Sequence, residues 1–193
     1  MPPGLVEDPV LRQRFSFTRT TDGGGEVLDV ETWVDPGGGV TPHVHPAIEE
    51  RFEVLEGEPS FLAGRSWRTA SAGETVEVPA GVRHAYRNRG DRTAHMVCHV
   101  RPPSSLQEFL EEVAALSRAG KLTRGGLPKG PGALLDAAAI AHRHRDMVVL
   151  GFPPMPPAVV QRVLFGLLAP IGERRRRRPE RRAEGQGGGD GER

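Results

Sequence analysis

Cysteine and long apolar runs are what this chain of 193 residues most clearly lacks. Its single cysteine, Cys98, excludes an intrachain disulfide. No stretch reaches the roughly 20 apolar residues that a membrane-spanning helix needs. The first ten residues, MPPGLVEDPV, have neither the basic region nor the apolar run of a signal peptide. We therefore expect a soluble, cytoplasmic protein.

Lysine is also scarce, with two lysines against 24 arginines, which indicates a GC-rich coding sequence and a bacterial source. The net charge is +1, but residues 173–193 alone carry eight arginines against five acidic residues. The other 172 residues carry 18 basic and 20 acidic residues. This mildly acidic body gives no support to nucleic-acid binding, so we expect no nucleic-acid partner.

Residues 13–100 consist of short strand-like segments separated by turns rich in Gly and Pro. The segments are RFSFTRT, EVLDVETWV, RFEVLEGEPSFLAG with a turn at its centre, RSWRTA, ETVEVPAG, HAYRN and TAHMVCHV. No helix of ordinary length fits between them. Regular short strands with such turns predict an all-β sandwich or barrel.

The pattern becomes helical after Pro102–Pro103. The first predicted helix starts at Ser104 or Ser105 and stops at Gly120. Its apolar residues recur at helical spacing and are Leu106, Phe109, Leu110, Val113 and Leu116. The sequence also predicts a second helix over 132–147 and a third over 156–172, which has prolines at its start.

The composition divides the chain into three parts. We predict a β-barrel domain over residues 1–102 and a helical extension over 103–172. Residues 173–193 contain no apolar residue beyond one alanine, which predicts a disordered basic tail. An apolar helix followed by arginines also allows a membrane-surface role, but we favour a helix that packs on the barrel or on a second copy.

Residues 43–50, HVHPAIEE, raise the main functional question. On a strand His43 and His45 point to the same face. Two imidazoles side by side inside a barrel are costly unless something lies between them, and a divalent metal is the usual solution. His84 begins another strand after a Pro-Ala-Gly turn and adds a third imidazole. Three imidazoles and a carboxylate suit a transition metal better than calcium or magnesium.

Two complete motifs surround these histidines. The first reads Gly37, five residues, His43-Val44-His45, four residues, Glu50, six residues, Gly57. The second reads Gly73, five residues, Pro79-Ala80-Gly81, two residues, His84, three residues, Asn88. Together they resemble the paired motifs of the cupin superfamily, with every fixed position filled. The resemblance covers about residues 25–100 and does not extend to the helical part.

The resemblance implies a double-stranded β-helix, or jelly-roll, barrel with a metal near one open end. It carries over His43, His45, Glu50 and His84 as the metal ligands. Glu49 competes with Glu50, but only Glu50 keeps the six-residue spacing to Gly57, and a slip of one residue would reverse the facing of the strand. The alternative is a metal-free barrel in which these groups are buried polar residues or line a sugar-type pocket.

The chemistry expected from this ligand set depends on the metal. Four protein ligands on a six-coordinate ion leave two adjacent positions open. We favour Fe²⁺ and a dioxygenase-type oxidoreductase acting on a small-molecule substrate. Mn²⁺, Ni²⁺, Zn²⁺ or Co²⁺ would instead suit a metal-dependent isomerase or cyclase of secondary metabolism. A non-catalytic module that binds a small ligand is a further alternative.

Strand parity from His84 places Tyr86 and Asn88 inside the barrel. Tyr86 is the candidate catalytic residue, as a proton donor or substrate partner, with a core aromatic as the equal alternative. An apolar lining of the metal site could come from four further residues, for which ordinary core packing is the alternative: Trp33, Phe52, Phe61 and Met96.

The other histidines and Cys98 receive simpler interpretations. His95 and His99 lie on the last strand, where surface or core positions are more common than a contact with a metal ligand. We interpret Cys98 as a small buried hydrophobe. His142 and His144 are two apart on a predicted helix, do not face each other, and are predicted to be surface residues. We expect a homodimer, since cupin barrels often pair through their sheets.

Overall fold

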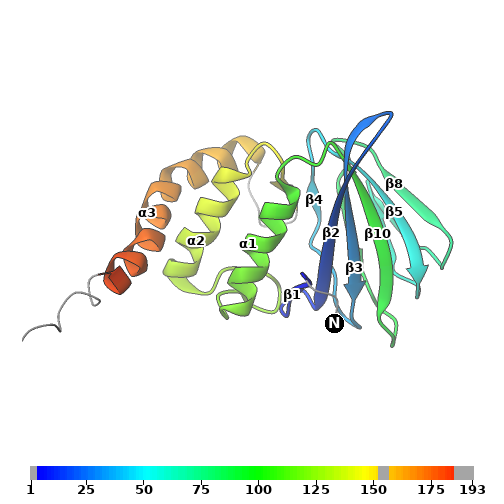
Figure 1. Ribbon diagram of the computed structural model, residues 1–193, viewed down its shortest axis with the longest axis horizontal. Helices are drawn as coiled ribbons and strands as arrows, with labels where there is room; N and C mark the ends of the chain where they lie inside the picture. The colour runs from blue at the N-terminus through cyan, green and yellow to red at the C-terminus, as the bar shows by residue number, and fades with distance from the viewer. Residues whose placement is uncertain (1–3, 152–156, 185–193) are drawn as a thin grey trace, which may run out of the picture.

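The computed structural model describes residues 4–151 and 157–184. In this part of the chain two antiparallel sheets face each other as a jelly-roll barrel, and three helices lie in layers beside it (Figure 1). The fold is therefore mainly β with a C-terminal helical extension, as predicted. None of the described helices has both the length and the apolar character needed to cross a bilayer.

The six-stranded sheet contains the longest strands. In spatial order it consists of β1 (Val6–Asp8), β2 (Gln13–Asp22), β3 (Gly25–Val34), β10 (Ala94–Arg101), β5 (Glu49–Glu56) and β8 (Thr75–Val78). β10 lies at the centre and alternates strictly between buried and half-buried residues. Its inward residues, Ala94, Met96, Cys98 and Val100, belong to or adjoin the main hydrophobic core.

The five-stranded sheet closes the other side of the barrel. Its order is β11 (Val149–Leu150), β4 (His43–Val44), β9 (His84–Arg87), β6 (Ser60–Ala63) and β7 (Ser66–Thr69). The strands expected between residues 13 and 100 are all present, whereas β1 and β11 were not predicted from the sequence. β11 comes from the helical extension and pairs antiparallel with β4, with Leu150 opposite His43.

The glycines of the two motifs serve the turns that connect these strands. Gly37, Gly57, Gly73 and Gly81 all have positive φ, between +78° and +85°. A side chain at Gly57 would also place its Cβ 3.0 Å from the Cα of Ala94. Only glycine satisfies both the left-handed backbone and the close approach, which explains its fixed place after the six residues that follow Glu50.

All three helices begin near the expected residues, and α1 and α2 also end near them. They are α1 (Leu106–Arg118), α2 (Gly130–Arg143) and α3 (Ala158–Glu184). Ser105 occupies the N-cap position of α1 but makes no capping hydrogen bond. Its hydroxyl instead lies 2.7 Å from Nδ1 of His144, at the end of α2. This contact ties the start of α1 to the end of α2.

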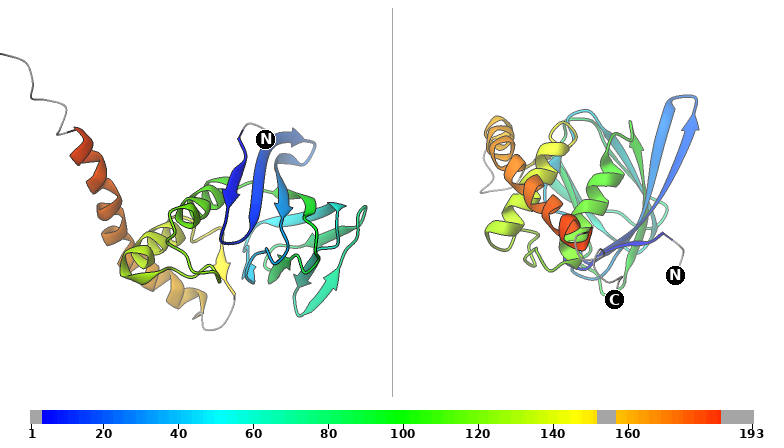
Figure 2. Two further views of the ribbon diagram at one scale, coloured as in Figure 1. Left: turned by 90° about the horizontal axis from the view of Figure 1, so that it is seen from below. Right: turned by 60° about the vertical axis from the view of Figure 1, so that its left-hand side comes forward.

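The helical extension is continuous with the barrel. α1 lies against β1, and α2 separates α1 from α3 (Figures 1 and 2). Leu106, Met147 and Val148 from the extension join the same core cluster as the barrel residues. Together with the β4–β11 pairing, this shared core holds the extension over one end of the barrel.

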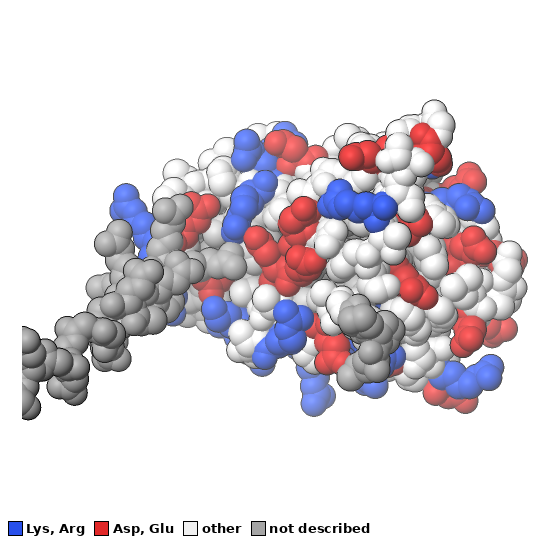
Figure 3. Space-filling view, viewed as in Figure 1, with Lys and Arg blue, Asp and Glu red and all other residues white. Residues whose placement is uncertain are grey.

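The predicted start of the disordered tail at residue 173 is wrong for its first part. α3 continues through the arginine run to Glu184, because arginine is a good helix former and no glycine interrupts the helix after Gly172. Residues 185–193 lie outside the described part of the chain. On the face shown in Figure 3 basic and acidic side chains are interspersed over the barrel and the helices.

Candidate metal centre

Three histidines from two strands and an adjacent loop meet at one point. β4 and β9 pair antiparallel with His43 directly opposite His84, and His45 follows β4 by one residue. One ring nitrogen from each lies within 4.8 Å of the others. The convergence follows from the sheet, because cross-strand neighbours and residues two apart share a face.

The second nitrogen of each ring is held by a backbone carbonyl. Nδ1 lies 2.9 Å from the Thr41 oxygen in His43, 2.8 Å from the Met147 oxygen in His45, and 2.9 Å from the Val82 oxygen in His84. A carbonyl only accepts, so each Nδ1 carries the proton and donates it. In the neutral rings the three Nε2 atoms are therefore left with lone pairs, the tautomer that metal-ligating histidines adopt.

The distance between two of these lone pairs tests whether a metal fits. Nε2 of His43 lies 3.2 Å from Nε2 of His45. Two acceptors cannot hydrogen-bond to each other, so this approach is unfavourable unless a cation shares both lone pairs. The donor set of three imidazole nitrogens beside a carboxylate thus fits a borderline divalent ion.

Glu50 places its carboxylate beside the histidines. It is buried, whereas Glu49 is exposed, so the strand has the facing expected from the spacing to Gly57. Oε2 of Glu50 lies 2.7 Å from Nε2 of His84, and Oε1 lies 3.6 Å from Nε2 of His45. The 2.7 Å pair lacks hydrogen-bond alignment, and both of its atoms are shielded from solvent. Both atoms are therefore available to a shared ion.

The electrostatics of the cluster keep three of the four candidate ligands, His43, His45 and Glu50, in the forms that bind metal. Burial, followed by the neighbouring His84, lowers the pKa of His43 to about 3, and burial also lowers the pKa of His45. Burial alone would raise the pKa of Glu50, but the three histidines, His84 first, outweigh it and lower that pKa to about 2. Burial acts downward on His84 too, yet contact with Glu50 raises its pKa. His84 and Glu50 form an ion pair whenever a proton replaces a metal.

Residues 30–100 match the cupin domain family, and the match includes both motifs. A region of 107 residues is 33% identical to a protein described as polyketide synthase CurC from Streptomyces cyaneus, covering 51% of this chain and 70% of that protein. The chain belongs to the cupin superfamily. The family match lies within the barrel and does not reach the helical extension.

Two further proteins are similar to part of this chain. A segment of 65 residues is 35% identical to the HTH-type transcriptional regulator SutR of Escherichia coli, covering 34% of this chain and 36% of that protein. A solved structure of a Klebsiella pneumoniae protein with a double-stranded β-helix domain is 26% identical. It covers 46% of this cupin and 75% of that chain, with a TM-score of 0.41.

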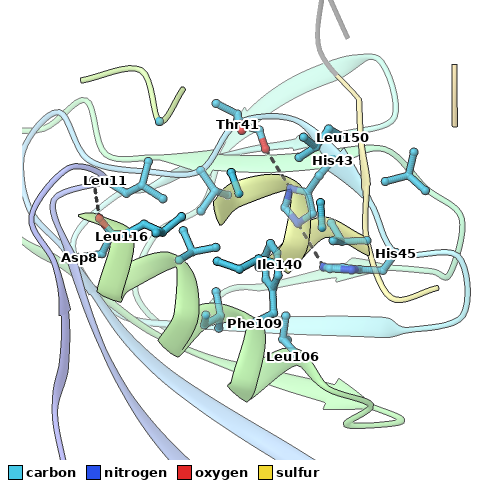
Figure 4. A pocket seen from close by; sticks show the side chains of 18 of the residues that line it. Asp8, Leu11, Thr41, His43, His45, Leu106, Phe109, Leu116, Ile140 and Leu150 are labelled. Atoms are coloured by element: carbon cyan, nitrogen blue, oxygen red, sulfur yellow. Dashed lines mark hydrogen bonds between the residues drawn. The ribbon is translucent and has the colours of Figure 1, made fainter. Parts of the chain in front are cut away.

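A cavity of about 390 Å³ opens beside the candidate ligands, between the barrel and the helices (Figure 4). His43, His45, Glu50 and His84 all line it. The apolar face of α1 forms another wall, with Leu106, Phe109, Leu110, Val113 and Leu116. From Leu106 to Leu116 the helix rises by ten residue steps, so this wall is roughly 15 Å long. The cavity is therefore elongated and mainly apolar, and His43 and His45 lie toward the end opposite Asp8 (Figure 4).

Tyr86 lies inside the barrel, as parity predicted, and lines the cavity. Its hydroxyl donates a hydrogen bond to Oε1 of Gln13 at 2.8 Å. Burial, with further contributions from Cys98 and Glu50, raises the pKa of Tyr86 well above its usual value. Tyr86 therefore keeps its proton at neutral pH and is a donor, not a base. Cys98 is buried nearby, and burial raises its thiol pKa as well, which agrees with its role as a small hydrophobe.

The other residues considered for the cavity have different positions. Phe52 lines the cavity, while Phe61 and Met96 pack in the core. Trp33 was a wrong candidate, because its neighbours Thr32 and Val34 take the inward face of β3. Its ring stacks on His95 outside the barrel, with centroids 4.7 Å apart. Asn88 is buried, but its amide donates to the backbone oxygens of Val34 and Arg92 and so stabilises a turn.

His95 and His99 both lie on the outer face of the barrel. Nε2 of His95 is 2.8 Å from Glu31, and Nδ1 of His99 is 2.7 Å from Asp29. Each imidazole pairs with a carboxylate of β3 across the sheet. Neither histidine contacts the candidate ligands, in agreement with their interpretation from the sequence.

The surface prediction for His144 is wrong. His144 is buried against Phe109 and bonded to Ser105, while His142 is half-buried against α3. Sequence reasoning also missed the Met147 carbonyl, which holds His45, and Gln161 of α3. The Gln161 amide donates to the Leu150 oxygen at 2.8 Å and its oxygen accepts from the Leu150 nitrogen at 3.3 Å. No sequence signal marks these three contacts, since each of them uses a backbone atom.

Proposed function

We propose that this cupin is a metal-dependent enzyme that converts a small organic molecule, most specifically a dioxygenase-type oxidoreductase. His43, His45, Glu50 and His84 would hold one divalent metal. The observation that carries the proposal is the set of three Nε2 lone pairs, fixed by three Nδ1–carbonyl hydrogen bonds, that face an apolar cavity. A structural site would be closed, whereas this one adjoins space for a substrate.

Fe²⁺ is the favoured metal, with Mn²⁺, Ni²⁺, Zn²⁺ and Co²⁺ as alternatives, because the ligand set suits any of them and supply decides use. When bound, such an ion supplies Lewis acidity and, as iron, the redox chemistry that dioxygen activation requires. The chain itself supplies the surroundings. The helices over the barrel end exclude water from the cavity, which strengthens electrostatic interactions with a bound substrate.

The cavity favours a substrate with an apolar body and an oxygen-bearing end. Its α1 wall carries only aliphatic and aromatic side chains over roughly 15 Å. At the end near the histidines, Tyr86 is a protonated donor whose partner Gln13 also lines the cavity. Tyr86 would turn its single O–H from Gln13 to a substrate oxygen, to which it would donate a hydrogen bond or a proton.

A metal-dependent cyclase or isomerase is the second candidate. The 33% identity to a protein described as a polyketide synthase favours it, since cyclisation and isomerisation need the Lewis acid and Tyr86 but no dioxygen. A module that only binds a small ligand is consistent with the barrel shared with a transcriptional regulator. The cavity over the ligands favours catalysis over this last alternative.

The first experiment measures metal. Protein purified without chelator should contain close to one transition metal per chain, and Glu50→Ala should reduce this content to near zero because a buried carboxylate ligand is lost. Glu49→Ala is the matched control, since the exposed neighbour should leave metal content unchanged. Stoichiometric metal in the Glu50→Ala protein would refute the ligand assignment.

The second experiment separates the candidate reactions. The iron-loaded protein is incubated with a panel of flavonols, catechols and diketones while dioxygen is monitored. Uptake matched to product formation supports the oxygenase proposal. Conversion under argon with no oxygen uptake supports the cyclase or isomerase instead. Binding without conversion by any metal-loaded form identifies a ligand-binding module.

A further inference from the structure

α3 presents large aliphatic side chains to solvent on the side opposite its packing face. The most exposed are Val159, Val160, Val163, Leu164, Leu167 and Ile171, with exposed fractions from 42% to 72%. At 3.6 residues per turn they occupy a sector of about 140° of the helix. We call these six residues the α3 stripe.

The opposite side of α3 is built for close packing. Gly172 approaches α2 so closely that an added Cβ would lie 2.3 Å from the Leu135 oxygen. Ala169 and Gln161 are buried on the same side. The helix thus buries its small residues against the extension and exposes its large aliphatic ones, the reverse of what a surface helix of a monomer does.

The size of the α3 stripe indicates a protein partner. Its six side chains leave on the order of 600 Å² of apolar surface exposed, at the upper limit for the largest patch of a typical monomer. A standard stable interface buries about 800 Å² on each partner. A helix pair with its polar borders reaches that area, so the α3 stripe alone supplies most of a dimer contact.

We propose that the α3 stripe is the dimer interface, in which the α3 helices of two copies of this chain pack antiparallel about a two-fold axis. Charge selects the orientation. Arg174 follows the stripe in the same sector of the helix and is exposed. A parallel pair would place the two Arg174 side chains together. An antiparallel pair separates the two Arg174 side chains, because each then lies beyond the opposite end of the other copy's stripe.

A lipid surface fits these charges less well. A helix that lies on a membrane carries cationic side chains along the borders of its apolar face. Alongside the stripe, between Ala158 and Gly172, the helix has one, Arg162, which lies 3.5 Å from Asp146. The arginine run of α3 begins only beyond the end of the stripe, at Arg174. The interface would also stabilise the cavity without covering it, because Phe165 and Arg162, on the other side of α3, contribute to the cavity wall.

Light scattering coupled to size exclusion tests the interface on the full chain. Wild-type protein should elute at twice the 20.9 kDa of one chain. Leu167→Glu should weaken the dimer by about 100-fold, as expected for charge at the centre of an apolar contact, and retain its metal content. Leu55→Glu, an exposed leucine on the outer face of β5, is the matched control and should remain dimeric.

Four results would overturn the proposal. They are a monomeric wild type, a Leu167→Glu protein that remains dimeric, dissociation caused by Leu55→Glu, and binding to anionic vesicles that Leu167→Glu abolishes. Val163→Glu repeats the test if Leu167→Glu does not fold. Because metal content is read separately, failure here is distinct from failure of the proposed function.

Disulfide cross-linking tests the orientation. In a Cys98→Ala background, Val159→Cys combined with Ile171→Cys should form an intermolecular disulfide, because antiparallel helices bring the two positions together. Twelve residues of helix separate them by roughly 18 Å within one chain, too far for an internal bond. Cross-linking of each single-cysteine variant to itself would show a parallel pair and overturn the antiparallel arrangement.

Discussion

The barrel and the helical extension contribute different kinds of group to the same site. The barrel supplies the candidate ligands and Tyr86, all of them side chains at fixed motif or parity positions. The extension supplies a backbone carbonyl at Met147, an edge strand beside His43, and the apolar wall of α1. Reactive groups therefore come from one region, while their orientation and enclosure come from the other.

This difference decides what a sequence can reveal. Side chains that bind metal are restricted to a few residue types at set spacings, so they leave a motif. A carbonyl that orients a histidine exists at every residue, and an apolar wall tolerates many substitutions that conserve volume. The residues that the barrel contributes to the site can therefore be predicted from the sequence, whereas those that the extension contributes cannot.

The strongest test on the barrel side removes one hydroxyl. Tyr86→Phe should lower turnover by about 10² or more if the hydroxyl serves as a donor to substrate, with metal content unchanged. It should also cost about 1–3 kcal/mol of unfolding free energy, because Oε1 of Gln13 loses its buried partner. Metal analysis, turnover and urea unfolding measure the three effects.

A matched control for this substitution is Trp67→Phe, which changes an aromatic residue of β7 outside the cavity. Tyr86 is also the only tyrosine, so an absorbance titration reports on it alone. The raised pKa predicts no ionisation until well above the usual range. Unchanged turnover with reduced stability would leave Tyr86 as a core residue and remove it from the catalytic proposal.

Particular residues show how far the sequence led. Glu50 is buried and Glu49 exposed, which is the facing that the six-residue spacing to a positive-φ glycine predicted for β5. Trp33 was placed on the wrong face because alternation identifies two faces of a strand without saying which is inward, and a large aromatic fits either. The stacking partner that decides its place, His95, lies 62 residues away in the sequence.

The helices were harder to interpret for a different reason. α3 has apolar residues around its whole circumference between 158 and 172, so the helical period did not indicate which side packs. His144 looked like a surface residue because it follows His142 and precedes arginine. Its burial depends on Ser105 and Phe109 of α1, and such packing between helices leaves no local pattern.

A smaller effect is expected from the extension, where Gln161 holds the backbone of Leu150 opposite His43. Gln161→Leu removes both hydrogen bonds while conserving size. We expect metal affinity to fall by about 10-fold, at the low end for groups that orient ligands, measured by titration with Zn²⁺. Gln107→Leu on α1 is the control and should bind normally. An unchanged affinity for Gln161→Leu would show that the barrel alone orients its ligands.

The smallest effect concerns pH and the contact between α1 and α2. Burial first, and then Arg143, lowers the pKa of His144 below its usual 6.5, while Glu112 of α1 acts in the opposite direction. The folded protein therefore binds this proton less readily than the unfolded chain. The corresponding stability is complete above the unfolded pKa and is lost as the pH falls below it.

Urea unfolding at about pH 7 and about pH 5 should accordingly show a larger loss of stability in wild type than in His144→Gln. The glutamine retains a hydrogen-bonding group near Ser105 and cannot take up the proton. His142→Gln, two residues earlier on α2, is the control and should lose stability as wild type does. Equal losses of stability in wild type and His144→Gln would mean that protonation of His144 does not destabilise the protein. The pH response of the fold would then have to come from the barrel.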